Sequence, residues 1–378
     1  MTVVIGLTAD RVRIPFRRPF ATTTGMWLHH DAWIIQLHSA DGRVGVGEAA
    51  LGPAPGDVAE TVLAQLVREV AMDAAAGHLP SAVDLDLHGT PGRALGAAIA
   101  SAMLDLERPV AATLDGEYAW VRVNATIPSV GPSAAAQAAL QAVEAGFRTL
   151  KIKVGVERET EALVERVRAI RTAIGPDIAL RLDANGAWDL PTAEDRLAAI
   201  DRFGIEYVEQ PMPASEFDGL ADLRRLVRVP IAADESVESV RAARALLAAD
   251  AVDVLVAKPA RVGGPAAVAE IAELAAARGI PVVVSTLFET GIGIAAALAA
   301  AMDLPEIDGS RFAETPAHGL ATAGLLEHDL LEESLIVDDG WMRAPAGSGS
   351  RGLGIVVDRR AVARFRGEAA GRIPLRTA

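Results

Sequence analysis

The sequence contains no cysteine, and basic residues are outnumbered by acidic ones. Without cysteine the chain forms no disulfide, no thiolate nucleophile and no cysteine-ligated metal site. It has 36 Lys and Arg against 50 Asp and Glu, for a formal net charge of −14 at pH 7. That balance argues against nucleic acid or an anionic membrane as the main partner. An acidic chain that handles an anionic substrate therefore needs a local positive feature, such as a metal ion or lysines.

The sequence also lacks an unbroken membrane-spanning run and a secretion signal. The most apolar stretch, residues 280–302, is interrupted by Pro281, Glu289 and glycines, which predicts a buried strand followed by a buried helix. Residues 1–14 alternate like a strand and show no basic region or small-residue cleavage site. The absence of cysteine suits a reducing compartment. We therefore expect a cytoplasmic protein that does not contact membranes.

The first third of the chain has the pattern of an α+β domain. Residues 1–50 alternate in short strands, with Asp41-Gly42 as a hairpin turn, and residues 57–106 are rich in Ala and Leu, as helices are. Strands followed by helices predict an α+β domain over residues 1–120. The segment RRPFATTTGMW at 17–27 is polar and contains glycine, so we predict a loop that reaches away from its sheet.

From residue 121 to about residue 330 the pattern changes to seven strand–helix pairs. The predicted strands are VRVNATI, TLKIKV, IALRLDAN, YVEQP, IAADE, DVLVAKP and PVVVST. Seven consecutive pairs with right-handed crossovers fit a closed barrel better than an open sheet. The short strands SLIVDDGWM and GLGIVV, within residues 331–378, are predicted to return to the first domain.

Five charged residues recur at nearly even intervals in the barrel region. Lys153, Asp183, Glu209, Asp234 and Lys258 are separated by 30, 26, 25 and 24 residues. A strand and its return helix take roughly 25–30 residues, so each charge is predicted at the carboxyl end of a successive parallel strand. A charge at the end of a buried strand is costly unless it is paired or used, so five in register predict one site.

The three acidic residues of this series are predicted to bind a metal ion. Asp183, Glu209 and Asp234 come from adjacent strands, which lie about 5 Å apart, so their carboxylates can converge. Three oxygen ligands, with no cysteine and no nearby histidine, favour Mg²⁺ or Mn²⁺ over zinc. The alternative is a structural network of salt bridges with Lys153 and Lys258.

The lysines are predicted to supply acid–base chemistry. Lys151 and Lys153 share one face, because strand side chains alternate, and Lys153 is nearer the strand end. Lys258 leaves from the opposite side of the barrel. A lysine beside other cations in a dry pocket titrates closer to neutrality, which suits a general base. Together the residues predict a metal ion that binds a substrate carboxylate and stabilises the enediolate formed when a base removes the α-proton. Alternatively, the lysines only balance the carboxylates.

These residues stand in motifs that resemble the enolase superfamily, and within it the muconate lactonizing enzyme subgroup. The motifs, in order, are KIK at 151–153, DANGAW at 183–188, VEQP at 208–211, ADES at 233–236 and KPARVGG at 258–264. The resemblance covers nearly the whole chain. It implies an α/β fold, a (β/α)7β modified TIM barrel at 121–330, with an N-terminal α+β capping domain at 1–120 and a C-terminal return at 331–378.

The resemblance also implies roles for individual residues. Lys153 and Lys258 would be catalytic, with Lys151, Asn185 and Glu235 as supporting polar groups. The seventh strand ends in Ser285-Thr286 rather than in the histidine base of mandelate racemase-like members. The last strand lacks the Asp-x-Asp of dipeptide epimerases. Muconate cycloisomerases are not excluded by motif.

Three further segments resemble the o-succinylbenzoate synthase family. They are VNATIP at 123–128, HGLATAGLLEHDL at 318–330 and RRPFATTTG at 17–25. This implies a Mg²⁺-dependent dehydratase of menaquinone biosynthesis that acts on 2-succinyl-6-hydroxy-2,4-cyclohexadiene-1-carboxylate. Lys153 would remove the α-proton and assist departure of the hydroxyl as water, while Lys258 would stabilise the enediolate through a cation–π contact.

The same resemblance implies substrate-binding residues. Thr22 to Trp27 would form a capping loop over the site, with Thr22 and Thr24 facing the substrate. Ser285 and Thr286 would lie near its succinyl end. The alternatives are a loop without such a role and a Ser-Thr pair that only caps the next helix.

A second activity stays open on the same residues. ARVGG at 260–264 resembles the GRVGG of N-succinylamino acid racemases, in which Lys153 and Lys258 would act on opposite faces of Cα. Arg261 would then bind substrate, or be a surface residue beside a helix start. The intact set of five charges argues against a non-catalytic scaffold. An unrelated phosphate-binding barrel would need a glycine-rich loop, for which Gly291-x-Gly293 is a weak candidate. The expected partner is a small-molecule carboxylate substrate, and a homo-oligomer is left open.

Overall fold

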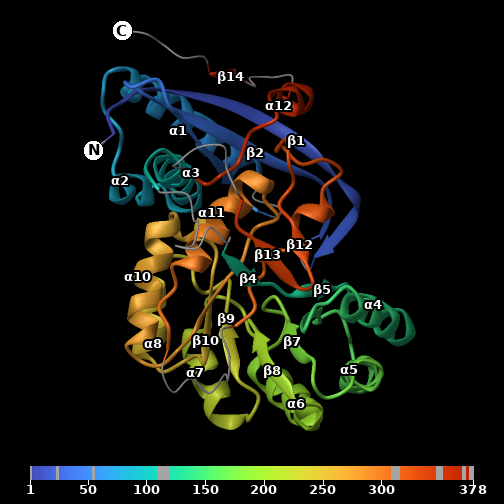
Figure 1. Cartoon of the computed structure of the whole chain (residues 1–378). Helices are drawn as coiled ribbons and strands as arrows, with labels where there is room; N and C mark the ends of the chain where they lie inside the picture. The colour runs from blue at the N-terminus through green and yellow to red at the C-terminus, as the bar shows by residue number, and fades with distance from the viewer. Residues whose placement is uncertain are drawn as a thin grey trace.

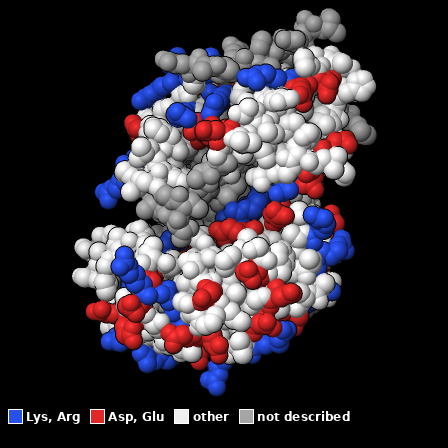
Figure 2. Space-filling view, turned by 180° about the vertical axis from the view of Figure 1, so that it is seen from behind, with Lys and Arg blue, Asp and Glu red and all other residues white. Residues whose placement is uncertain are grey.

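The computed structural model describes residues 2–22, 25–52, 56–108, 119–307, 316–345, 352–367 and 372–373. Within these ranges the strands form a four-stranded, a seven-stranded and a three-stranded sheet. The four-stranded sheet and its helices form an upper layer, and the seven-stranded sheet lies below it (Figure 1). Seen from behind, the molecule narrows between these two parts, and charged side chains of both signs stand at this waist (Figure 2). No described helix is both long and apolar enough to cross a membrane.

The upper layer is an antiparallel sheet in the order β14-β1-β2-β3, with the helices of residues 56–75 and 89–107 packed against it. The elements are β1 Val4–Thr22, β2 Gly25–Ser39, β3 Val44–Ala50, β14 Arg372–Ile373, α1 Gly56–Ala75, α2 Ala82–Asp86 and α3 Gly89–Glu107. Glycine lets α3 lie directly on β3, because a Cβ on Gly45 or Gly47 would come within 2.0 Å of a carbonyl oxygen of α3. Leu7, Trp33 and Leu95 belong to the buried cluster between sheet and helices.

The segment predicted as a loop at 17–27 is mostly strand. β1 and β2 pair through Phe20 with Trp27, Ala21 with Met26 and Thr22 with Gly25, so the hairpin continues to its end. The loop prediction is wrong there because threonine and aromatic residues extend a strand as readily as they form a loop. The register is irregular only between Pro15 and Phe20 along this end.

The lower layer is a parallel sheet in the order β11-β10-β9-β8-β7-β6-β5. Its strands are β5 Ala125–Ile127, β6 Thr149–Lys153, β7 Ala179–Asp183, β8 Ile205–Glu209, β9 Ile231–Ala233, β10 Val254–Ala257 and β11 Val282–Val284. The helices between and after them are α4 Pro132–Glu144, α5 Thr160–Ile174, α6 Leu190–Ile200, α7 Phe217–Leu226, α8 Val240–Ala248, α9 Pro259–Val262, α10 Pro265–Ala276 and α11 Gly291–Met302, with 3-10 turns η1 Asp201–Phe203 and η2 Ala323–Leu325. Figure 1 shows α4, α5, α6 and α10 around the outside of the sheet.

Residues 318 and 319 join the two edges of this sheet. His318 forms a parallel bridge with Val123, just before β5, and Gly319 forms one with Ser285, just after β11. The short stretch thus takes the place of an eighth strand and closes the barrel. The predicted (β/α)7β modified TIM barrel with an N-terminal α+β capping domain is confirmed. The domain boundaries at 120/121 and 330/331 stay a prediction.

Two strand predictions are corrected by long-range pairing. The run VRVNATI divides into β4, Trp120–Arg122, and β5, because β4 pairs with β13, Trp341–Arg343, next to β12, Val337–Asp338. The SLIVDDGWM strands therefore join β4 and not the first sheet. GLGIVV forms no strand, but it does return to the first domain, where the Leu353 N–H donates to Asp105 Oδ1 of α3 at 2.7 Å, and Val357 forms a bridge to Leu331. α12, Arg359–Phe365, and β14 also contact the first sheet.

Candidate active site

Strand register brings the five evenly spaced charges together. Lys153 pairs with Asp183, and Asp183 with Glu209, at the carboxyl ends of β6, β7 and β8. Asp234 directly follows β9, and Lys258 directly follows β10. Because parallel strands end at one rim of the barrel, all five side chains stand at the same rim. The lysines are concentrated at this rim. The whole chain has three lysines, and they are Lys151, Lys153 and Lys258.

The carboxylates are buried and ion-paired. Asp183, Glu209 and Asp234 are each at most 1% exposed. Lys151 Nζ lies 2.8 Å from Glu209 Oε1 and 3.0 Å from Asp183 Oδ2, and Lys153 Nζ lies 2.7 Å from Asp183 Oδ2. As these side chains stand, no group of three His, Cys, Asp or Glu in the described residues is arranged to hold a metal ion. The lysines take up the carboxylate oxygens instead.

The electrostatics of the three acids are uneven. Burial alone raises the pKa of each, but Lys151 and Lys153 bring the pKa of Asp183 well below its ordinary value. Burial together with the charge of Asp183 raises the pKa of Glu209 to about 8, even though Lys151 stands beside it. The three carboxylates are thus matched by three lysines, and Glu209 is the acid whose charge is least compensated. Three hard oxygen donors, with no cysteine or histidine among them, suit Mg²⁺ or Mn²⁺.

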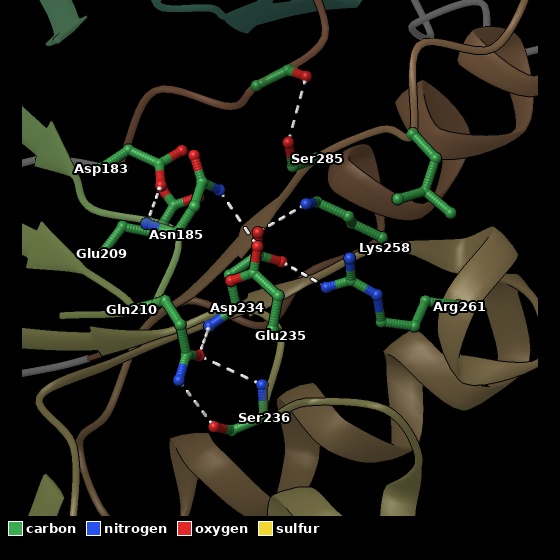
Figure 3. A network of polar contacts seen from close by, with 12 residues as sticks. Asp183, Asn185, Glu209, Gln210, Asp234, Glu235, Ser236, Lys258, Arg261 and Ser285 are labelled. Atoms are coloured by element: carbon green, nitrogen blue, oxygen red, sulfur yellow. Dashed lines mark hydrogen bonds and ion pairs between the residues drawn. The ribbon is translucent and has the colours of Figure 1, made fainter. Parts of the chain in front are cut away.

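Asp234 is held by two cations from the β10 side. Lys258 Nζ lies 2.5 Å from Asp234 Oδ2, and Arg261 Nη1 lies 2.7 Å from Asp234 Oδ1 (Figure 3). Burial raises the pKa of Asp234, but Lys258 and Arg261 outweigh it and lower the pKa to about 2. The alternative that Arg261 is a surface residue is wrong, because it points inward to this carboxylate.

Asn185 connects the β7 and β9 ends of the site. Its Oδ1 accepts a hydrogen bond from Lys153 Nζ at 3.0 Å. Its Nδ2 donates to Glu235 Oε1 at 3.0 Å (Figure 3). The backbone of Asn185 lies in the left-handed region, at φ 46°, which asparagine tolerates better than most residues. Burial and then the charge of Asp234 raise the pKa of Glu235. These contacts fit the supporting places that the resemblance gives to Asn185 and Glu235.

Of the residues predicted to bind substrate at the cap and at the seventh strand, the structure describes the side chains of Ser285 and Thr286. Ser285 Oγ donates to the carbonyl oxygen of Gly319 at 3.4 Å, and Thr286 Oγ1 shares a hydrogen bond with Thr322 Oγ1 at 3.0 Å. Both hydroxyls stand at the end of β11 and are buried. The side chain of Thr22, and all of Thr24, lie outside the described residues. Contact of these four residues with substrate stays a prediction.

Two buried side chains below and beside the site were missed from sequence. Gln210 Oε1 accepts hydrogen bonds from the N–H groups of Asp234 and Ser236, at 2.9 and 3.1 Å (Figure 3). Arg181, fully buried, lies with its Cζ 4.7 Å from the Tyr207 ring centroid and donates to the carbonyl of residue 317 at 2.6 Å. Alternation in IALRLD puts Arg181 on the face of Asp183, and that signal could have identified it.

A cavity of about 390 Å³ lies elsewhere, on the capping layer. It is lined by residues of β1, β2 and α1, among them Arg11, Arg13 and Trp27. Its guanidinium groups are already paired, Arg11 with Glu60 at 2.8 Å and Arg13 with Asp31 at 2.9 Å. No group of it belongs to the strand-end cluster, so we do not assign the chemistry to this cavity.

Comparison with known proteins gives a family and several relatives. The enolase C-terminal domain-like family matches residues 134–361. An o-succinylbenzoate synthase from Thermobifida fusca (strain YX) is 43% identical over 217 residues, which are 57% of this chain and 64% of that protein. The match therefore spans less than two thirds of that relative's length.

Solved structures of two other activities superpose on nearly the whole chain. A muconate lactonizing enzyme from Pseudomonas fluorescens, complexed with muconolactone, has a TM-score of 0.81 at 27% identity and covers 97% of this chain and 100% of that one. A substrate-liganded L-Ala-D/L-Glu epimerase from Bacillus subtilis has a TM-score of 0.79 at 25% identity and covers 94% of this chain and 99% of that one. One fold and one arrangement of strands thus accompany several reactions.

Proposed function

We propose, because the chain belongs to the enolase superfamily and to its muconate lactonizing enzyme subgroup, that this enzyme is an o-succinylbenzoate synthase. Its substrate would be 2-succinyl-6-hydroxy-2,4-cyclohexadiene-1-carboxylate, dehydrated in menaquinone biosynthesis. The observation that carries the proposal is that Lys153 and Lys258 reach the same group of carboxylates from two sides. The Thermobifida relative of that name, 43% identical, supports the choice of substrate.

The reaction needs one group that takes a proton and returns it. Neutral Lys153 accepts the proton on the ring carbon that bears the carboxylate, and the electron pair of that C–H bond forms the enediolate. The enediolate then collapses, the bond from the neighbouring carbon to its hydroxyl breaks, and Lys153 returns the proton so that water leaves. A carbon–carbon double bond forms and the ring becomes aromatic. Lys258 stabilises the intermediate from the other side through its charge.

Asp183, Glu209 and Asp234 would hold the divalent cation. The fit rests on their chemistry, since all three are buried oxygen donors at the ends of neighbouring strands. When bound, the cation supplies positive charge that offsets the negative charge growing on the substrate carboxylate. Asn185 would keep Lys153 directed toward the substrate through its hydrogen bond to Nζ. The remaining steps belong to the lysines.

N-succinylamino acid racemisation is the second candidate, and Arg261 favours it. The ion pair of Arg261, a residue of the ARVGG motif, with the same carboxylate that Lys258 contacts supports this candidate. In a racemase Lys153 and Lys258 would exchange protons on opposite faces of one carbon. A muconate-type cycloisomerase would use the same two lysines.

One assay separates these activities. The purified chain is given the cyclohexadiene substrate with MgCl₂, and N-succinylamino acids with MgCl₂ in D₂O. We expect dehydration, its loss after chelation, and a fall of about 10²–10⁴-fold in kcat for Lys153→Ala. Lys153→Arg is the matched control, which keeps the charge but not the base and is also expected to be inactive. Full activity of Lys153→Ala, or deuterium exchange without dehydration, would contradict the proposal.

A further inference from the structure

The loop between β11 and α11, residues 286–290, contacts the capping layer through Leu287, Phe288 and Thr290, and we call it the docking loop. Thr290 donates from its N–H and from Oγ1 to Glu48 of β3, at 3.1 and 2.6 Å. A Cβ on Gly52 would lie 3.2 Å from the side chain of Leu287, so the two segments pack closely. The docking loop, which leaves the barrel rim, therefore also packs against the capping layer.

Phe288 of the docking loop packs against two aromatic rings of the β1–β2 hairpin. Its ring centroid lies 6.2 Å from that of Phe16 at 82°, and 6.0 Å from that of Trp27 at 79°. The Phe16 and Trp27 centroids lie 6.2 Å apart, and both residues are buried. Edge-to-face pairs of this kind stabilise a contact beyond the area they bury. One ring thus attaches both strands of the hairpin to the barrel rim.

The backbone of Phe288 is in an unfavourable conformation. Its φ is 68°, in the left-handed region that glycine and asparagine occupy readily and a bulky side chain rarely does. Such a conformation persists where the surroundings determine it, and it concentrates at functional positions. Glycine at this position would avoid the backbone strain. The benefit of phenylalanine here is the packing of its ring against Phe16 and Trp27.

We propose that Phe288 is a positioning residue that holds the end of the β1–β2 hairpin beside the carboxyl end of β11. Ser285 and Thr286 stand at that strand end, directly before the docking loop. The inference rests on the proposed function only in that substrate binds at this rim. Phe288 then governs how firmly the paired strands around Phe16 and Trp27 are held at the rim where substrate binds, whereas Lys153 carries the chemical step.

Trypsin cleavage in the hairpin tests the attachment. Arg17 and Arg18 are exposed and lie in the irregular part of β1, and the bond after Arg18 is protected because Pro19 follows. Trypsin therefore reports opening of this segment by cleaving after Arg17. Phe288→Gly removes the ring and relieves the left-handed strain together. In the full-length protein without ligand, we expect it to speed cleavage after Arg17 about tenfold.

Two further variants separate this effect from general destabilisation. Phe203→Ala removes another half-buried ring, just before β8 and so at the opposite end of the barrel, and should not speed cleavage after Arg17. Trp27→Ala removes the same contact from the hairpin side and should match Phe288→Gly, which it replaces if that variant does not fold. Unchanged cleavage in Phe288→Gly, or equal acceleration in Phe203→Ala, overturns the proposal.

Steady-state kinetics show what the attachment does. With the cyclohexadiene substrate we expect Phe288→Gly to raise KM about tenfold and to leave kcat within about threefold, as expected for lost binding without lost chemistry. A fall in kcat at constant KM would overturn the positioning role. If the unmodified protein does not act on this substrate, the proposed function fails. The trypsin assay still shows whether Phe288 holds the hairpin.

Discussion

Binding of Mg²⁺ is predicted to release about one proton at pH 7, and Glu209 is its source. In the folded protein the pKa of Glu209 is raised to about 8, because burial and the charge of Asp183 outweigh Lys151 at 2.8 Å. At pH 7 about nine in ten of these carboxyls carry a proton. A divalent cation binds the carboxylate form, so the proton must leave when the ion binds.

The pH dependence follows from this one group. One pH unit below its pKa, release is about 0.9 proton per ion, and at pH 9 it falls to about 0.1. The apparent affinity for Mg²⁺ should rise about tenfold per pH unit below pH 8 and level off above it. The pKa of Asp183 is lowered, so that carboxylate is already ionised across this range and adds nothing to the release.

Calorimetry in buffers of different ionisation enthalpy measures the released protons directly. MgCl₂ is titrated into the full-length protein at pH 7 and pH 9, and the slope of observed heat against buffer enthalpy counts protons. Glu209→Gln is the matched control, because an amide of the same shape holds no exchangeable carboxyl proton. No release at pH 7, or equal release in Glu209→Gln, would refute the reasoning.

Two further predictions concern stability. Burial and the charge of Glu48 raise the pKa of Glu289 to about 7 from 4.5, so folding favours its protonated form. The resulting stability is fully present below pH 4.5 and is lost as pH rises through about 7, a change of about 3 kcal/mol. Urea unfolding at pH 5 and pH 8 should show this difference shrink in Glu289→Gln, and an undiminished difference would assign it to other groups. Gly47→Ala places a Cβ 2.0 Å from the carbonyl oxygen of residue 98 and should lower the free energy of unfolding by about 1–3 kcal/mol. Gly324→Ala meets no atom within 4 Å and is the control, and equal losses in denaturant melts would contradict the packing argument.

The barrel and its charged rim were readable from sequence because both depend on local periodicity. Spacing placed Lys153, Asp183 and Glu209 on successive strands, and the register confirms that they are neighbours. Alternation put Lys151 one layer below Lys153, where it meets Glu209. Each unit of the barrel repeats the same pattern of one strand and one helix. One ambiguous segment therefore does not prevent the barrel from being predicted.

What was missed depends on partners far away in the chain. β4 is separate from β5 because residues 341–343 pair with β4. The sequence VRVNATI contains no signal that predicts this pairing. The end of the β1–β2 hairpin is strand rather than loop, and Phe288, more than 250 residues later, packs on it. Gln210 was not predicted as a site residue, because its side chain acts by accepting a hydrogen bond from the backbone N–H of Asp234 at the end of the next strand. Composition carries no record of such contacts.

The distribution of lysine gives an independent argument about the site. Of the 36 basic residues, only three are lysines, and all three stand at the carboxylate cluster. Arginine supplies every other positive side chain, including Arg261, which forms an ion pair with Asp234 beside Lys258. A guanidinium can balance a buried carboxylate as well as an ammonium, but it stays protonated and cannot serve as a base. If Lys153 and Lys258 only neutralised acids, arginine would serve there as it does at Arg261. The use of lysine at these positions alone therefore favours proton transfer over a purely structural salt-bridge network.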